Sequence, residues 1–156
     1  MDDFTQRYDL KYNNAFVFRG YISQIEYGSI LQEMCEIIAS NKLKVDGYVT
    51  TSSHGFNDDE KVDMEIIIPL NSSMKLNDDQ KTKFSFIETI SIENCLKVRQ
   101  EGNPQLINEK IEYMLKYISD NKLEALSDIY TVVIKDVMSM DDINNGIVEA
   151  YVQVSS

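Results

Sequence analysis

Residues 38–43 read Ile-Ala-Ser-Asn-Lys-Leu, and residues 118–123 read Ile-Ser-Asp-Asn-Lys-Leu. The two segments lie 80 residues apart, about half of the 156-residue chain. In front of each segment, apolar side chains recur at helical spacing. These side chains are Ile30, Leu31, Met34, Ile37 and Ile38 in the first half, and Ile107, Ile111, Met114, Leu115 and Ile118 in the second. The repeat therefore predicts two equivalent helices, the first over residues 28–42.

The starts of the two helices differ in how clearly the sequence marks them. Asn103, which is followed by a proline, is a good cap for the second helix, since proline has a suitable φ and no amide hydrogen to leave unpaired. The first helix has two candidate capping boxes, Ser29 with Gln32 and Ser23 with Glu26. Both alternatives stay open at the level of sequence.

Strand-like runs flank each helix in the same order, one before it and two after it. The runs are 14–22, 47–53 and 64–70 in the first half, and 84–98, 129–135 and 147–154 in the second. Each half therefore has the order β-α-β-β. We expect one domain over residues 1–156, with a first repeat at 14–70, a connector at 71–83 and a second repeat at 84–154. The connector is polar and has no Pro or Gly, which indicates a surface connection within one domain.

Residues 1–13 have no counterpart in the second half. Tyr8, Leu10 and Tyr12 alternate, so the segment is either an extra edge strand or a disordered tail. A single half of about 70 residues buries too little apolar surface to be secure alone. We therefore expect an α+β fold in which two tandem repeats share one antiparallel sheet with pseudo-two-fold symmetry and both helices on one face. A groove between the repeats is then a candidate ligand site.

Composition excludes several classes of function. The chain has 15 basic and 26 acidic side chains, a net charge of −11, which argues against a nucleic-acid partner. No apolar run is long enough to span a bilayer, and the first residues lack the features of a signal peptide, so we expect a cytoplasmic protein and no membrane partner. Cys35 and Cys95 are expected to be buried, reduced thiols.

Metal and cofactor chemistry has little support in the sequence. His54 is the only histidine, and it is expected to be solvated in the polar loop 54–63. The cysteines lack the spacing of metal ligands, and no phosphate or dinucleotide motif is present. We expect no cofactor and no metal.

The last strand of each half carries a loose motif. Residues 63–70 read Asp-Met-Glu-Ile-Ile-Ile-Pro-Leu, and residues 147–154 read Ile-Val-Glu-Ala-Tyr-Val-Gln-Val. With the two β-α-β-β units, this pattern resembles the GyrI-like effector-binding domains, also found as the sensor half of bacterial transcription activators. The resemblance covers residues 14–154. The pattern is also similar to stand-alone proteins of Gram-positive bacteria, some encoded near toxin and secretion genes.

The resemblance implies a ligand site around Glu149. In ligand-binding members of the family, an acidic residue at this strand position faces the cleft and pairs with cationic ligands. The physical reason is that a carboxylate in an apolar, aromatic site is costly unless it is paired. Tyr151, two residues further on, shares the face of Glu149 and adds an aromatic ring that suits a cationic amphiphile. The alternative is that Glu149 is a solvated residue on an open sheet face.

Four further residues are candidates for the same ligand. Glu65 is the equivalent of Glu149 in the first half. Tyr48 and Tyr130 offer side chains with an apolar body and a polar tip. Glu88 has the parity of the apolar residues of its strand, so either a bulge or strand end shifts the parity or this carboxylate is partly buried.

Three functions are compatible with these observations. The first is a domain that holds a small cationic or amphipathic molecule between its repeats. The second is an adaptor, chaperone or antitoxin-like protein whose partner is another protein. The third, which the resemblance only weakly implies, is a hydrolase of small electrophilic molecules, with Glu149 as base and a tyrosine beside it.

Overall fold

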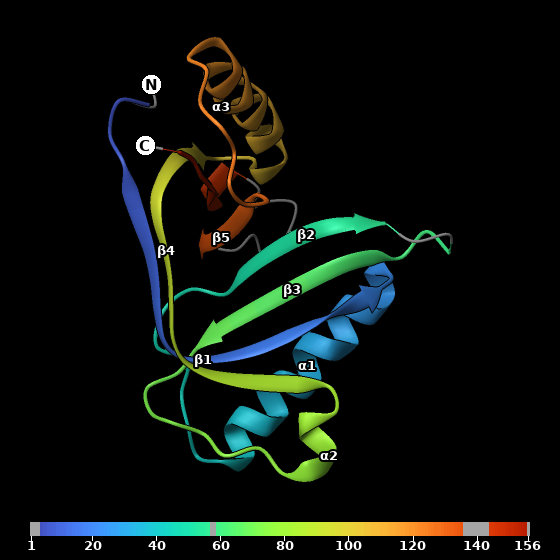
Figure 1. Cartoon of the computed structure of the whole chain (residues 1–156). Coiled ribbons are helices and arrows are strands. Elements are labelled where there is room, and N and C mark those ends of the chain that lie inside the picture. Colours follow the sequence, from blue (N-terminus) through green and yellow to red (C-terminus); the bar gives the residue numbers. More distant parts are fainter. Residues whose placement is uncertain (1–3, 57–58, 136–143, 156) are drawn as a thin grey trace. The chain divides into compact units, whose positions relative to one another are not determined.

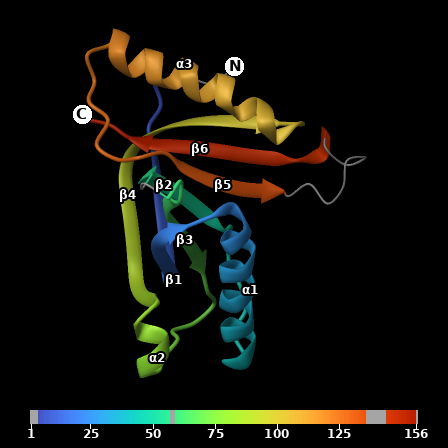
Figure 2. The ribbon, with the colours of Figure 1, turned by 90° about the vertical axis from the view of Figure 1, so that its right-hand side faces the viewer.

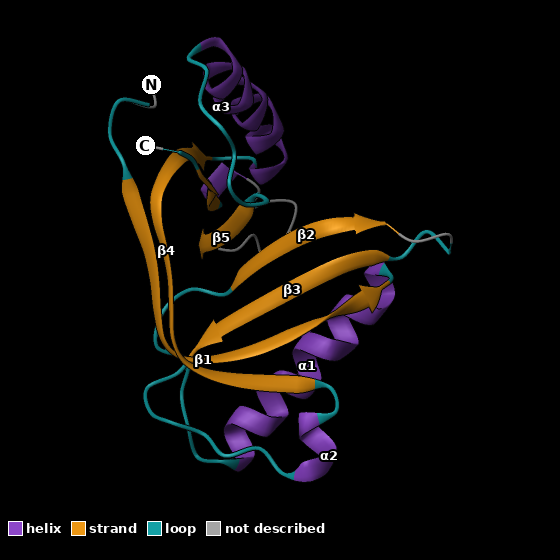
Figure 3. Cartoon of the chain, in the orientation of Figure 1, coloured by secondary structure: helices purple, strands orange, loops and turns teal. Residues whose placement is uncertain are grey.

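The computed structural model describes residues 4–56, 59–135 and 144–155. Its elements in chain order are β1 (Tyr8–Ile22), α1 (Gln24–Ser40), β2 (Thr50–Phe56), β3 (Val62–Pro69), α2 (Asp78–Lys81), β4 (Phe84–Glu101), the 3-10 helix η1 (Pro104–Leu106), α3 (Ile107–Asp120), β5 (Tyr130–Lys135) and β6 (Ile147–Gln153). Figures 1 and 3 show the helices and strands in this order, with two consecutive strands after α1 and again after α3. The predicted α+β class is confirmed. The short helix α2, within the connector, was not predicted.

The chain divides into two compact units, a first unit of residues Lys11–Ile90 and a second unit of Met1–Leu10 with Ser91–Ser156. The unit boundaries fall inside the long strands β1 and β4, so each of these strands contributes to both units. In the first unit β3 pairs antiparallel with both β1 and β2. Helix α1 covers one face of this sheet, as Figure 1 shows, and packs on it through Met34 and Ile38.

The second unit contains three paired strands and one long helix. Strand β6 pairs antiparallel with both β4 and β5. Helix α3 lies along one face of this sheet, as Figure 2 shows. Met114 and Ile118 of the helix join Leu96, Val98 and Ala150 of the strands in one buried apolar cluster. Because side chains alternate along a strand, the residues between these apolar ones face away from α3.

The helix starts settle the open alternative. Helix α1 begins after Ser23, whose side chain accepts a hydrogen bond from the Glu26 amide while the Glu26 carboxylate accepts one from the Ser23 amide. This is the Ser23 capping box, so α1 starts four residues earlier than the predicted range. Asn103 caps as expected, but it does so for η1, which leads directly into α3.

The two matching sequence segments form the same helix end. Asn41 and Asn121 are the C-caps of α1 and α3, and each side chain donates to a backbone carbonyl four residues earlier, at 2.8 and 2.9 Å. The next residues, Lys42 and Lys122, have left-handed φ angles of 58° and 56°. A residue in this conformation ends an α-helix because the chain can no longer continue its hydrogen-bond pattern.

A second pair of left-handed residues interrupts the long strands. Asn14 in β1 has φ of 54° and Asn94 in β4 has φ of 60°, and the two lie 80 residues apart. The Asn14 side chain donates to the Leu70 carbonyl at 3.4 Å, and the Asn94 side chain donates to the Val154 carbonyl at 2.8 Å. Asparagine tolerates this backbone conformation better than most residues. The two positions give β1 and β4 a matching local distortion.

The N-terminal segment and the connector differ from their simplest predictions. Tyr8, Leu10 and Tyr12 lie in β1 itself, so the strand alternative holds, as an extension of β1 and not as a separate strand. In the connector Met74 and Leu76 are buried and pack into the core of the first unit. The polar composition of this segment conceals its two anchoring residues.

Two single-residue expectations need correction. Cys95 is buried as expected, but Cys35 is exposed because it lies on the outer surface of α1. His54 belongs to β2 and is not solvated, since its side chain is only 14% exposed. Strand β2 extends further along the chain than the predicted run, which ends at residue 53. None of the described helices has the length and apolar character needed to cross a membrane.

Candidate functional site

The sheet face of the second unit that points away from α3 collects polar and aromatic side chains. Strand register places Arg99 opposite Glu149 and Lys97 opposite Tyr151. Since these positions alternate with the apolar residues packed on α3, their side chains share the other face. With Tyr8, they form a group that we call the Glu149 cluster: Tyr8, Lys97, Arg99, Glu149 and Tyr151.

Glu149 is a buried carboxylate with several partners. The residue is only 6% exposed. Its Oε2 atom lies 3.2 Å from Nη1 of Arg99 and 3.5 Å from Nζ of Lys97. Its Oε1 atom accepts a hydrogen bond of 2.9 Å from the Tyr151 hydroxyl. The interpretation of Glu149 as a solvated residue is therefore wrong. A buried carboxylate persists in a fold because such partners offset the cost of removing it from water.

Lys97 lies between the carboxylate and an aromatic ring. Its ammonium is 4.2 Å from the centroid of the Tyr8 ring and 3.5 Å from Glu149. The ring face and the carboxylate both attract a cation. Tyr8 reaches this position because the start of β1 belongs to the second unit, where the Asn94 amide donates to the Asp9 carboxylate at 3.1 Å.

Arg99 connects the cluster to its surroundings. Besides Glu149, it contacts Glu101, whose Oε1 lies 3.0 Å from the Arg99 Nε. Partial desolvation disfavours the charged guanidinium, but the hydrogen bonds to Glu149 and Glu101 outweigh it and raise the pKa of Arg99 above its ordinary value. The Lys110 ammonium of α3 donates to the Arg99 backbone carbonyl. The guanidinium is thus a permanent cation held in place on β4.

The corresponding face of the first unit has a different arrangement. Glu65 lies opposite Arg19 in the register of β1 and β3. Arg19 instead forms its ion pair with Asp63, at 3.2 Å. The His54 imidazole is close to Glu65, with Nε2 at 3.9 Å from Oε1, and the Glu65 side chain is 20% exposed. The Glu65 side chain is therefore more exposed to water than that of Glu149, which is 8% exposed.

The structure groups the predicted site residues unequally. Glu149 and Tyr151 are in direct contact, and Tyr130 lies opposite Tyr151 on β5. Glu65, Tyr48 and Glu88 belong to the first unit. Tyr48 is 50% exposed just before β2, and Glu88 is exposed in β4, so the alternative of a partly buried Glu88 is wrong. The predicted groove between the repeats stays a prediction.

Sequence reasoning missed three members of the cluster. Lys97 and Arg99 occupy the polar parity of β4, a pattern visible in the sequence, but they read as ordinary exposed strand residues. Tyr8 alternates with Leu10 and Tyr12 and could have been assigned to a strand, but its neighbour in space comes from a segment 89 residues away. The signal in the sequence is the pair of cations, Lys97 and Arg99, on one face of β4. It points to Glu149 only when the register of β4 and β6 is known.

The described residues contain no group of three or more potential metal ligands from His, Cys, Asp and Glu. Burial raises the pKa of the Cys95 thiol to about 11, with a smaller contribution from Asp9. A thiol of this kind is a poor nucleophile at neutral pH, because the reactive form is the thiolate. The chemistry that the cluster offers is charge recognition by a buried carboxylate beside aromatic rings.

Comparison with known proteins identifies the fold but not the family. No protein-family model matches the sequence, and no curated protein matches it. Among solved structures, the chain is similar to the EcmrR C-terminal domain, with a TM-score of 0.68, 16% identity, and coverage of 97% of this chain and 98% of that domain. It is also similar to EcmrR in its DNA complex, with a TM-score of 0.71, 17% identity, and coverage of 97% of this chain and 57% of the longer one.

A third similar structure contains a small molecule. SAV2435 bound to tetraphenylphosphonium has a TM-score of 0.52 and 14% identity, and the match covers 97% of this chain and 94% of that one. Identities this low show the fold alone. The expected resemblance to GyrI-like effector-binding domains is therefore supported at the level of the fold.

Proposed function

We propose that this chain is a small-molecule-binding domain of the GyrI-like kind, which holds a cationic, amphipathic ligand at the Glu149 cluster. The observation that carries the proposal is the position of Lys97, whose ammonium lies between a buried carboxylate and the face of a tyrosine ring. The same two groups attract an organic cation of a ligand. The Lys97 ammonium therefore occupies the place that a ligand cation would take.

The fold likeness supports the same assignment. SAV2435, whose structure contains tetraphenylphosphonium, is similar in fold over 97% of this chain. Tetraphenylphosphonium is a lipophilic cation with four aromatic rings. A ligand of this class combines the positive charge that Glu149 attracts with apolar surface that Tyr8 and Tyr151 contact favourably.

The test is a titration of the protein with tetraphenylphosphonium, followed by calorimetry. We expect wild-type protein to bind this cation and not the matched anion tetraphenylborate. The Glu149→Gln variant should bind at least tenfold more weakly, because it loses the charge while it keeps the size of the side chain. Glu93→Gln is the matched control, since Glu93 is an exposed residue of β4 and lies outside the cluster. No binding by the wild type, or equal losses in both variants, would reject the proposal.

A second variant guards against a loss of folding. Tyr151→Phe removes only the hydroxyl that donates to Glu149 and leaves the ring. We expect the folded variant, verified by circular dichroism, to bind the cation within about threefold of the wild type, because the charge and both rings remain. Loss of binding in Glu149→Gln together with retention in Tyr151→Phe assigns recognition to the carboxylate.

A further inference from the structure

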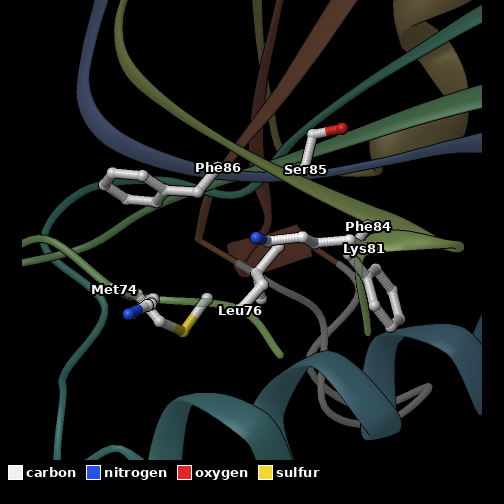
Figure 4. Close-up of a pocket in the computed structure, with 7 residues that line it drawn as sticks. Met74, Leu76, Lys81, Phe84, Ser85 and Phe86 are labelled. Carbon is white, nitrogen blue, oxygen red and sulfur yellow. The ribbon is translucent and has the colours of Figure 1, made fainter. Parts of the chain in front are cut away.

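A pocket of about 440 Å³ lies wholly within the first unit, apart from the Glu149 cluster. The connector and the start of β4 supply its walls, as Figure 4 shows. Its lining residues are Met74, Lys75, Leu76, Lys81, Phe84, Ser85 and Phe86. The volume falls in the range of small-molecule sites in proteins, about 300–1,000 Å³.

The apolar part of the pocket is firmly anchored. Met74, Leu76 and Phe84 are each at most 6% exposed and belong to the core of the first unit. The Phe84 ring packs against the ring of Phe16 with centroids 5.2 Å apart. The Lys83 ammonium lies 5.6 Å from the Phe84 centroid and pairs with a carboxylate elsewhere. The walls are thus held in place by contacts that need no ligand.

Two lysines supply positive charge at the opening. Lys75 and Lys81 are exposed, and within the described part of the chain neither ammonium has a carboxylate within 4 Å. Lys83 differs from both because Glu33 neutralises it at 2.8 Å. Lys81 ends the short helix α2, whose start is fixed by a capping box between Asn77 and Gln80. Two exposed lysines beside apolar walls thus mark the opening of this pocket, next to the acidic Asp78 and Asp79 of α2.

We propose that this pocket binds an amphipathic carboxylate, an organic acid with an apolar body and one carboxylate group. The apolar body packs on Phe86 and the accessible edges of Met74 and Leu76, and the carboxylate lies at Lys75 and Lys81. Both contributions are needed, since exposed ion pairs alone contribute only about 0.2–1 kcal/mol each. This site shares no residue with the proposed cation site.

The experiment titrates the full chain with decanoate, below its micelle concentration, and with the uncharged decanol of the same chain length. We expect decanoate to bind at least tenfold more tightly than decanol. The double variant Lys75→Gln/Lys81→Gln should remove this preference. Equal affinity for the two compounds, or no binding of decanoate, overturns the proposal.

A matched control separates a local from a global effect of charge. Lys11→Gln/Lys44→Gln removes the same two charges from exposed positions of the first unit that do not line the pocket. This variant should bind decanoate within about twofold of the wild type. Equal weakening in both double variants would show that net charge alone is responsible and overturn the proposal. Glu149→Gln should leave decanoate binding unchanged, so failure of the cation proposal and failure of this one give different results.

Discussion

The sheet faces of the two units differ at one pair of opposite residues that has the same position in both. In the first unit Val17 lies opposite Ile67, and both are buried. In the second unit the corresponding position holds Lys97 opposite Tyr151. The arginine–glutamate pair itself occurs in both units, as Arg19 opposite Glu65 and Arg99 opposite Glu149.

This difference shows how one backbone arrangement supports two kinds of surface. In the first unit the apolar pair leaves Glu65 with a distant histidine, while Arg19 pairs with Asp63. In the second unit Lys97 and the Tyr151 hydroxyl join Arg99 on one carboxylate. The change from Val17 opposite Ile67 to Lys97 opposite Tyr151 thus accompanies the change from an apolar pair to a buried cluster of charges. The predictions below test whether the two faces differ in energy as they differ in contacts.

The largest difference is expected between the two glutamates. Glu149→Gln leaves Lys97 and Arg99 without their shared counter-charge, and hydrogen bonds to charged groups contribute about 1.5–3 kcal/mol. We expect a loss of about 2 kcal/mol in the free energy of unfolding, measured by urea denaturation. Glu65→Gln, at a more exposed site with the His54 imidazole 3.9 Å away, should cost less than about 1 kcal/mol. Equal costs would contradict the distinction between the faces.

The next difference concerns the left-handed asparagines of the long strands. Alanine disfavours the left-handed backbone conformation, so the replacement of either asparagine by alanine should cost about 1–2 kcal/mol of stability. Asn94→Ala also loses a side-chain hydrogen bond of 2.8 Å, whereas the bond lost in Asn14→Ala measures 3.4 Å. We expect losses of about 2 and 1 kcal/mol in thermal or urea unfolding.

Glycine variants at the same positions separate the two causes. Glycine adopts positive φ without strain, so Asn14→Gly should cost less than Asn14→Ala. Asn94→Gly should still lose the contribution of its hydrogen bond to Val154, about 1 kcal/mol. Glycine variants that are as unstable as the alanine variants would show that backbone strain is not the cause.

Most of the fold could be predicted because its signals are local. Helical spacing located α1 and α3, and alternation located the strands, since both patterns arise from which side chains must be buried. Helix α2 was missed because a four-residue helix has no periodicity to detect. The anchoring roles of Met74 and Leu76 were missed because two apolar residues in a polar segment do not form a pattern.

The site could be predicted only in part, for a physical reason. Glu149 and Tyr151 are two residues apart on one strand, so the sequence alone places them on one face. Lys97, Arg99 and Tyr8 come from other strands, and their contacts depend on register and on the local distortion at Asn94. A shift of one residue in register would turn every side chain of the strand to the other face. Sequence periodicity does not fix that register.

The third prediction concerns Lys97, whose replacement by an apolar residue makes the sheet face of the second unit resemble that of the first. Lys97→Met keeps the length of the side chain but removes the ammonium next to Glu149 and Tyr8. If a ligand cation uses these same two groups, it no longer competes with Lys97 and meets less repulsion. We expect the affinity for tetraphenylphosphonium to rise about tenfold, equivalent to about 1.4 kcal/mol, in the titration described above.

The control for that change is Lys11→Met, which removes an exposed ammonium of β1 that lies outside the Glu149 cluster. Its affinity for the cation should stay within about twofold of the wild type. A tenfold rise in both variants would point to the net charge of the chain. No rise in Lys97→Met would mean that Lys97 and the ligand do not share a site.

The smallest effects are expected at the helix starts, where α1 has a complete capping box and α3 has no side-chain cap of its own. Ser23→Ala removes the hydroxyl that accepts from the Glu26 amide and should cost about 1 kcal/mol in urea unfolding. Asn103→Ala affects only the short η1 and should cost less. A larger cost at Asn103 would contradict the ranking of the two helix starts.

The capping box also predicts a dependence on pH. The Ser23 amide and then the Lys61 ammonium stabilise the charged Glu26 carboxylate and lower its pKa in the folded state. A lowered pKa gives stability that is fully present above the unfolded value and is lost as the pH falls through the folded value. Glu26→Gln should therefore be less stable than the wild type at pH 7, and the difference should vanish in acid. Glu109→Gln, in the first turn of α3, is the control because Leu106 provides no side-chain cap there. An equal pH dependence in both variants would assign the effect to the helix dipole, since both helices have one, and not to the capping box.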